Sequence, residues 1–195
     1  MDSGVLIPLF PLRILPLPGE LVPLHIFEPR YKQLLQDVEE RDVRFGIYFD
    51  HPINNERLGS FMRLESVIKR YPKGELDVIV KCEDVFILKE QKGTYPGKLY
   101  PGGKVHFKNL NLEKFPHQEL FDAFTIFQFK RGITHKNNAF TIYQIANELS
   151  LDFPERYKLM TLSSEKQEQF LKTKVSYQTV LMEHEEKSRD IYHLN

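Results

Sequence analysis

The chain has 195 residues, of which 41% are hydrophobic and 28% are charged, so it can bury a core without disulfide or metal cross-links. Its 27 basic residues balance 27 acidic residues, which disfavours a general nucleic-acid binder because phosphate contacts need a basic excess. The single cysteine, Cys82, excludes an intramolecular disulfide and a cysteine-rich zinc site. The start of the chain lacks the basic lead-in of a secretory signal, and no apolar run reaches the roughly 18 residues that span a bilayer. We therefore expect a cytoplasmic protein.

Six of the 12 prolines lie in the first 29 residues, interleaved with leucine, isoleucine and phenylalanine. Proline removes a backbone donor and restricts the residue before it, so this segment cannot be helical. We predict short extended pieces joined by kinks, then a strand over residues 22–26 that Pro23 places at an edge or bulge. Glu28-Pro29 predicts the start of a helix, whose apolar residues recur at helical spacing: Tyr31, Leu34, Leu35 and Val38.

The pattern from residue 43 to residue 108 is typical of strands. Residues 58–71 and 75–89 read as two long strands joined by a turn at Pro72-Lys73-Gly74. A new apolar run after Asp84 predicts a bulge or bend nearby. Several strands with Gly and Pro turns and one inserted helix favour a small barrel over an α/β sheet.

From about residue 112 the apolar period becomes helical. Thr141 and Gln144 have the spacing of a capping box, ahead of a helix that contains Ile145. Ser164 begins the longest predicted helix, whereas the aromatic run that ends at Phe129 is compatible with a helix or a strand. The chain is thus predicted to be α+β, with a β-rich part over residues 1–111 and a helical part over residues 112–195.

Motifs for catalysis and for metal binding are missing from the sequence. In residues 93–99 the spacing between the glycines is too short for a phosphate loop, and Leu99 stands where Ser or Thr would hold magnesium. No Gly-x-Ser-x-Gly motif is present. The side chains of His25 and Glu28 diverge in an extended segment, and Cys82 is expected to be a small buried hydrophobe. We therefore predict no enzyme activity, no cofactor and no metal.

Three tyrosines beside proline turns are candidates for contact with a partner: Tyr71, Tyr95 and Tyr100. A ring at a turn can stay partly exposed, and tyrosine is enriched among the residues that dominate binding energy. The alternative is that each ring packs on its own sheet. If the three loops gather at one end of the barrel, the tyrosines form one binding surface.

Three stretches near the start of the chain follow one another with defined gaps: Ile7-Pro8-Leu9-Phe10-Pro11-Leu12, Leu17-Pro18-Gly19-Glu20, and Pro23 through Tyr31. In this combination they resemble the opening of the Lon protease N-terminal domain family, and weaker similarity continues to the last helix. The resemblance implies a PUA-like β-barrel with one inserted helix, followed by a C-terminal helical bundle. It also implies a stand-alone form of the substrate-recognition domain, because the chain has no room for the family's ATPase and protease domains.

The resemblance and the missing motifs together favour a non-enzymatic module that binds proteins or peptides. Its partners would be unfolded or exposed apolar segments of other proteins, or a separate protease or adaptor, and neither nucleic acid nor a membrane is expected. RNA binding is the alternative, since PUA-like barrels elsewhere bind RNA. That alternative needs a basic face, for which Lys98, Lys104 and Lys108 are the candidates in the strand region.

We predict that the purified protein neither hydrolyses ATP nor cleaves unfolded casein, because it has no phosphate loop and no nucleophile motif. Phosphate release and casein fragmentation measure the two activities. Turnover that co-purifies with the protein and is lost on a point change within this chain would contradict the prediction.

Overall fold

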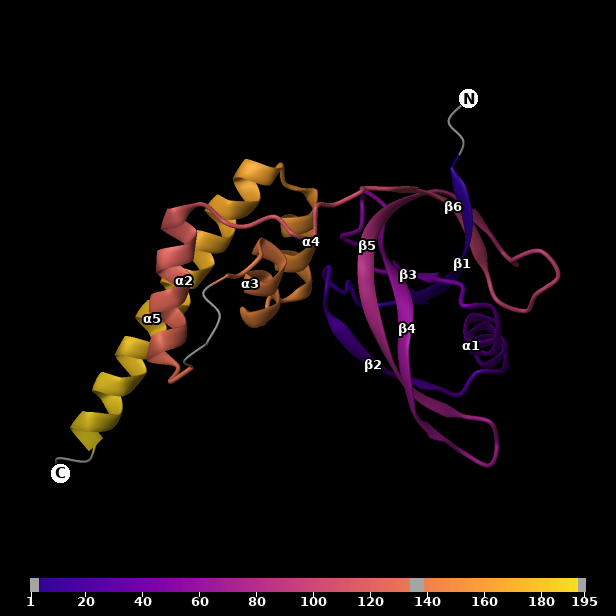
Figure 1. Ribbon diagram of the computed structural model, residues 1–195, viewed down its shortest axis with the longest axis horizontal. Coiled ribbons are helices and arrows are strands. Elements are labelled where there is room, and N and C mark those ends of the chain that lie inside the picture. Colours follow the sequence, from indigo (N-terminus) through magenta and orange to yellow (C-terminus); the bar gives the residue numbers. More distant parts are fainter. Residues whose placement is uncertain (1–3, 134–138, 193–195) are drawn as a thin grey trace. The chain divides into compact units, whose positions relative to one another are not determined.

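The computed structural model describes residues 4–133 and 139–192 (Figure 1). The chain divides into two compact units. The first is built on the first 111 residues together with residues 153–157, and the second on residues 112–152 and those after residue 157.

The described residues contain six strands and five helices. The strands are β1 (Val5–Leu12), β2 (Leu21–Ile26), β3 (Phe45–Phe49), β4 (Leu58–Arg70), β5 (Leu76–Lys92) and β6 (Gly102–Phe107). The helices are α1 (Pro29–Arg41), α2 (Gln118–Lys130), α3 (Ile142–Glu148), α4 (Phe153–Thr161) and α5 (Ser164–Tyr192). None of the helices in this part of the chain combines the length and the hydropathy that crossing a membrane requires.

Five strands close into a barrel, and β2 is added at an edge. The hydrogen-bonded order is β2-β5-β4-β3-β1-β6, and β6 pairs back onto β5. The long strand β5 pairs with both β2 and β6, because residues 76–81 form the ladder with β2 and residues 86–92 form the ladder with β6. The predicted barrel is confirmed, and so is the position of Pro23 on an edge strand.

A β-bulge divides β5 at the position that the apolar run after Asp84 predicted. Phe61 lies opposite Asp84 but Met62 lies opposite Cys82, so Glu83 is an extra residue on β5. Because Phe61 and Met62 point to opposite faces of the sheet, Cys82 and Asp84 do as well. The alternation of side chains along β5 is therefore reversed after the bulge.

Strand β1 is continuous, whereas its prolines predicted short pieces joined by kinks. Residues 5–8 pair antiparallel with β6, and residues 9–12 pair parallel with β3. Each half of β1 thus forms its ladder with a different neighbour. Pro8 and Pro11 are accommodated because a sheet tolerates a residue without an N–H on the side that carries no ladder.

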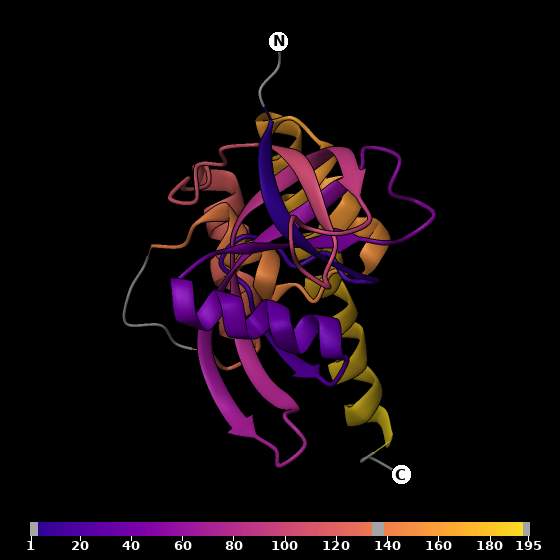
Figure 2. The same cartoon turned by 90° about the vertical axis from the view of Figure 1, so that its right-hand side faces the viewer.

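Two hydrophobic clusters occupy the two faces of the sheet in the first unit. The first cluster lies under α1, which contributes the four residues predicted for its apolar face, Tyr31, Leu34, Leu35 and Val38. Figures 1 and 2 show α1 between the β4–β5 hairpin and the β5–β6 connection. The second cluster contains Phe86 and Leu88, which lie after the bulge in β5, together with Ile7, Leu9 and Val105.

The ring of Phe86 requires two glycines on neighbouring strands. A Cβ at Gly46 would lie 2.6 Å from this ring, and one at Gly59 would lie 2.2 Å from it. Both distances are far below van der Waals contact, so any side chain at these positions would displace the ring. The two glycines therefore allow the second cluster to pack closely.

The second unit is helical, and its two longest helices run side by side in the same direction. Glu119 pairs with Lys172 at 2.5 Å, and Lys130 pairs with Glu183 eleven residues further along each helix. The aromatic run that ends at Phe129 is part of α2, which resolves the choice between helix and strand. The predicted capping box is confirmed, because the Thr141 side chain accepts from the Gln144 N–H and the Gln144 side chain accepts from the Thr141 N–H.

Residues 153–157 belong to the first unit, although the sequence placed them in the helical part. Arg156 binds Glu20 through two contacts of 2.5 and 3.0 Å and donates to the Leu15 carbonyl at 3.3 Å. Phe153 lies against Phe49, with 6.2 Å between ring centroids. Helical periodicity could not indicate these contacts, because their partners lie more than 100 residues away in the sequence.

We predict that Ile145→Ala destabilises the protein by about 2–5 kcal/mol, since the side chain is fully buried in α3 and its removal leaves a cavity. The midpoint of urea unfolding measures this loss. The control is Ile126→Ala, because Ile126 lies on α2 and is 53% exposed. A midpoint equal to that of the wild type for Ile145→Ala would contradict the assignment of this core.

Candidate functional site

The candidate site is the face of the β2–β5–β4 sheet that points away from α1, which we call the outer sheet face. Along β2 and the first half of β5 the odd-numbered side chains lie on this face, because the even-numbered ones pack into the first cluster. Pro23 lies opposite Ile79, and His25 lies opposite Asp77. The outer sheet face comprises Leu21, Pro23, His25, Ser66, Ile68, Lys69, Tyr71, Asp77, Ile79 and Lys81, so its apolar side chains lie among charged and polar ones.

Apolar side chains of the outer sheet face remain in contact with water. Leu21 is 56% exposed and Ile68 is 62% exposed, and Phe27, directly after β2, is 60% exposed. Single exposed apolar residues are common on folded proteins, but several gathered on one sheet are typical of a binding surface. Covering apolar area contributes about 25 cal/mol per Å². Binding of a partner that covers this face with apolar side chains would therefore be favourable in free energy.

A second β-bulge, in β4, explains the exposure of Ile68. Val67 lies opposite Val78 and Lys69 lies opposite Asp77, so Ile68 is an extra residue without a partner position on β5. Val67 packs against the first cluster. At the bulge Ile68 shares the side of Lys69, which lies opposite Asp77 on the outer sheet face, and its 62% exposure agrees with this placement.

A polar cluster occupies the end of the outer sheet face next to the β4–β5 hairpin. The two carboxylate oxygens of Asp77 have separate partners: Oδ1 lies 2.6 Å from His25 Nδ1, and Oδ2 accepts from the Tyr71 hydroxyl at 2.7 Å. The phenol and then the imidazole hold the pKa of Asp77 below its ordinary value. The same hydrogen bond, reinforced by burial, raises the pKa of Tyr71. The cluster fixes the Tyr71 ring beside the apolar residues.

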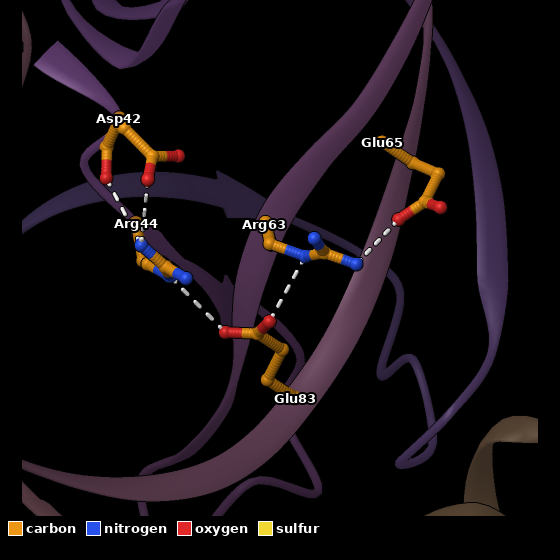
Figure 3. Close-up of polar contacts among 5 residues, drawn as sticks. All are labelled: Asp42, Arg44, Arg63, Glu65 and Glu83. Atoms are coloured by element: carbon orange, nitrogen blue, oxygen red, sulfur yellow. Dashed lines mark hydrogen bonds and ion pairs between the residues drawn. The ribbon is translucent and has the colours of Figure 1, made fainter.

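A row of five charged residues borders the outer sheet face near the bulge in β5 (Figure 3). In the order of their contacts, Asp42, Arg44, Glu83, Arg63 and Glu65, they alternate in sign. Glu83 lies between two arginines, with Oε2 3.2 Å from Arg44 Nε and Oε1 3.0 Å from Arg63 Nε. Arg63 also contacts Glu65 at 2.8 Å. Partly exposed pairs of this kind contribute at most about 1 kcal/mol each. Their main consequence here is a charged border beside an apolar surface.

The structure separates the three tyrosines that the sequence singled out. Tyr71 belongs to the outer sheet face, whereas Tyr95 and Tyr100 lie together in the β5–β6 connection, with 5.8 Å between their ring centroids. Figure 1 shows that connection apart from the β4–β5 hairpin. The three loops therefore do not gather into one surface. A binding role for Tyr71 and for Tyr95, both half-buried, stays a prediction.

The expected partial exposure of Tyr100 was wrong. Its side chain is 2% exposed, and its hydroxyl donates to Asp37 Oδ2 at 2.8 Å. Lys98 donates to Asp37 Oδ1 at 2.7 Å. Burial alone would raise the pKa of Asp37, but the hydrogen bonds from Lys98 and Tyr100 outweigh it and the pKa is lowered. Tyr100 thus ties the β5–β6 connection to α1.

The remaining candidate groups of the sequence offer no reactive site. The thiol of Cys82 is fully buried, and burial raises its pKa far above the ordinary value. His25 contacts Asp77, whereas Glu28 pairs with Arg30 at 2.8 Å. Among the side chains that the structure describes, no group of three or more His, Cys, Asp and Glu is placed to hold a metal ion.

We predict that Tyr71→Phe raises the pKa of Asp77 toward its ordinary value, because the phenol hydrogen bond stabilises the charged carboxylate. Carboxyl ¹³C NMR shifts followed against pH measure the change. The pKa of Glu119 is lowered by Lys172, which shares no partner with Tyr71, so it serves as the control. An unchanged Asp77 titration would show that the hydrogen bond is not formed in solution.

Comparison with known proteins gives matches of structure and none of sequence. No family model matches the chain, and no curated protein matches it. A Lon N-terminal domain protein from Xanthomonas campestris is similar, with 22% identity and a TM-score of 0.64 over 81% of this chain and 90% of that one. The N-terminal domain of the Mycobacterium avium complex Lon protease is also similar, with 11% identity and a TM-score of 0.60 over 88% of this chain and 98% of that one. The chain therefore has the fold of Lon N-terminal domains, as its opening residues implied.

Proposed function

We propose that this protein is a non-enzymatic module that binds exposed apolar segments of other proteins through its outer sheet face. The observation that carries the proposal is the group of water-exposed apolar side chains on one open sheet, above all Leu21 and Ile68. Unfolded or partly folded clients expose the side chains that they normally bury, which are complementary to such a face. Substrate recognition is also the role that the sequence resemblance implies, and the shared fold supports it.

The backbone of β2 favours contact through side chains over pairing of another strand at its edge. Cys82 N–H donates to the Glu20 carbonyl, so Glu20 and the even-numbered residues of β2 direct their backbone groups toward β5. The odd-numbered residues direct theirs to the open edge, where Pro23 has no N–H to give. A proline at this position interrupts pairing with another strand. Clients would therefore be held mainly by Leu21, Ile68 and Tyr71.

The environment of the strand-region lysines supports a protein partner over RNA. Lys98 is bound to Asp37, and Lys104 lies 3.2 Å from Glu90. Burial lowers the pKa of Lys108. These three lysines do not present the concentrated positive charge that phosphate binding requires.

The test is a titration of fluorescent casein, used as an unfolded model client, against the wild type and two single variants. Ile68→Ser and Tyr71→Ala should each weaken binding by about 1 kcal/mol, or roughly fivefold, because each removes contact area at the face. Fluorescence anisotropy measures the affinity. Thermal unfolding of each variant checks that the fold is kept.

The matched control is Ile126→Ser, which removes an isoleucine of similar exposure from α2. This variant should bind casein as the wild type does. Equal affinities for the wild type, Ile68→Ser and Tyr71→Ala would contradict the proposal. An equal loss in Ile126→Ser would contradict it too, since binding would then follow general surface hydrophobicity.

A further inference from the structure

A groove in the second unit differs in chemistry from the outer sheet face. It has a volume of about 370 Å³ and lies where the end of α4 meets the first half of α5. Lys158 and Leu162 line it from α4 and the link that follows, and Lys166, Phe170 and Lys174 line it from α5. The three α5 residues are four apart in sequence, so they form one stripe along the helix. We call this site the lysine groove.

An aromatic ring lies between cations in the lysine groove. The Lys158 ammonium is 5.4 Å from the centroid of the Phe170 ring, and the Lys174 ammonium is 5.8 Å from it. Both distances are within the range of a cation–π interaction. Phe170 is half-buried, so part of its ring remains available to a ligand. The groove thus offers an apolar floor and a positively charged rim.

The charged side chains that line the lysine groove are all positive. Its lining contains three lysines and, within the described part of the chain, no carboxylate. On α5 the acidic residues nearest the groove do not line it, since Glu168 contacts Lys114 at 2.6 Å and Glu165 lines a different hollow together with residues of α2. In a chain of zero net charge, three clustered lysines create a local positive potential. That potential favours an anionic ligand.

We propose that the lysine groove binds an acidic segment of a partner protein. Carboxylates of the segment would lie against Lys158 and Lys166, and an aromatic or apolar side chain would cover Phe170. The site is separate from the outer sheet face, and its occupation does not depend on that face.

The observations favour an acidic peptide over RNA. Single-stranded RNA is held by several stacking platforms along an extended basic groove, whereas this groove has one ring and the volume of a few side chains. Its cations are all lysines, and the planar fork of arginine that grips phosphate in two places is missing from the lining. A short segment with two or three carboxylates beside an aromatic residue matches both the charge and the size.

The experiment uses the full chain and a labelled peptide of sequence Glu-Asp-Phe-Glu-Asp-Glu. Fluorescence anisotropy at low salt should detect binding, and the peptide with Gln and Asn in place of the acids should bind about tenfold more weakly. Lys158→Gln and Lys166→Gln should each weaken binding of the acidic peptide by about threefold. Lys172→Gln is the matched control, because Lys172 lies on the same helix but pairs with Glu119 outside the groove.

Three results would overturn the proposal. The first is equal affinity for the acidic and the neutral peptide, and the second is an equal loss in Lys172→Gln and Lys166→Gln. The third is binding of a single-stranded RNA oligonucleotide that is tighter than binding of the acidic peptide and is lost in Lys166→Gln. That result would make the groove a nucleic-acid site. Ile68→Ser should leave peptide binding unchanged, so a failure of this site and a failure of the outer sheet face are distinguishable.

Discussion

The bend of β5 at residues 82–84 is the constraint on which the first unit depends. The extra residue Glu83 reverses the alternation of side chains, so that one strand supplies Cys82 to the cluster under α1 and Phe86 to the cluster on the opposite face. The carboxylate of Asp84 holds the bend, since it accepts from the Val85 N–H at 2.7 Å and from the Asn109 N–H at 3.1 Å. The point at which β5 leaves β2 for β6 is therefore fixed.

The same bend creates the outer sheet face. Beyond it β5 completes the barrel with β6, while before it β5 extends with β4 and β2 as a three-stranded sheet. Alpha-helix α1 covers one face of this extension, and Leu21 and Ile68 stay exposed on the other. An open sheet edge invites association with other strands, and Pro23 counteracts this on β2. The exposed face can thus remain apolar without an edge that pairs indiscriminately.

Local signals predicted much of the fold, whereas the site depends on contacts that no local signal carries. The start of α1 at Pro29, the bulge near Asp84 and the Thr141 cap follow from the chemistry of a few neighbouring residues. The bond between His25 and Asp77 joins residues 52 apart and arises only from the register of β2 on β5. Tyr100 looked like a turn tyrosine, but a carboxylate on α1, 63 residues earlier, draws its hydroxyl into the core.

The two proposed surfaces differ in how they would respond to salt, because their attraction has different physical origins. Binding at the outer sheet face would depend on covering Leu21 and Ile68, and burial of apolar area is not weakened by screening. Binding at the lysine groove would depend on Coulomb attraction to partly exposed lysines, which falls off over about a Debye length. A client with both an apolar and an acidic segment gains from effective concentration when its linker spans the two sites. Selectivity for such clients would then need no strong contact at either surface.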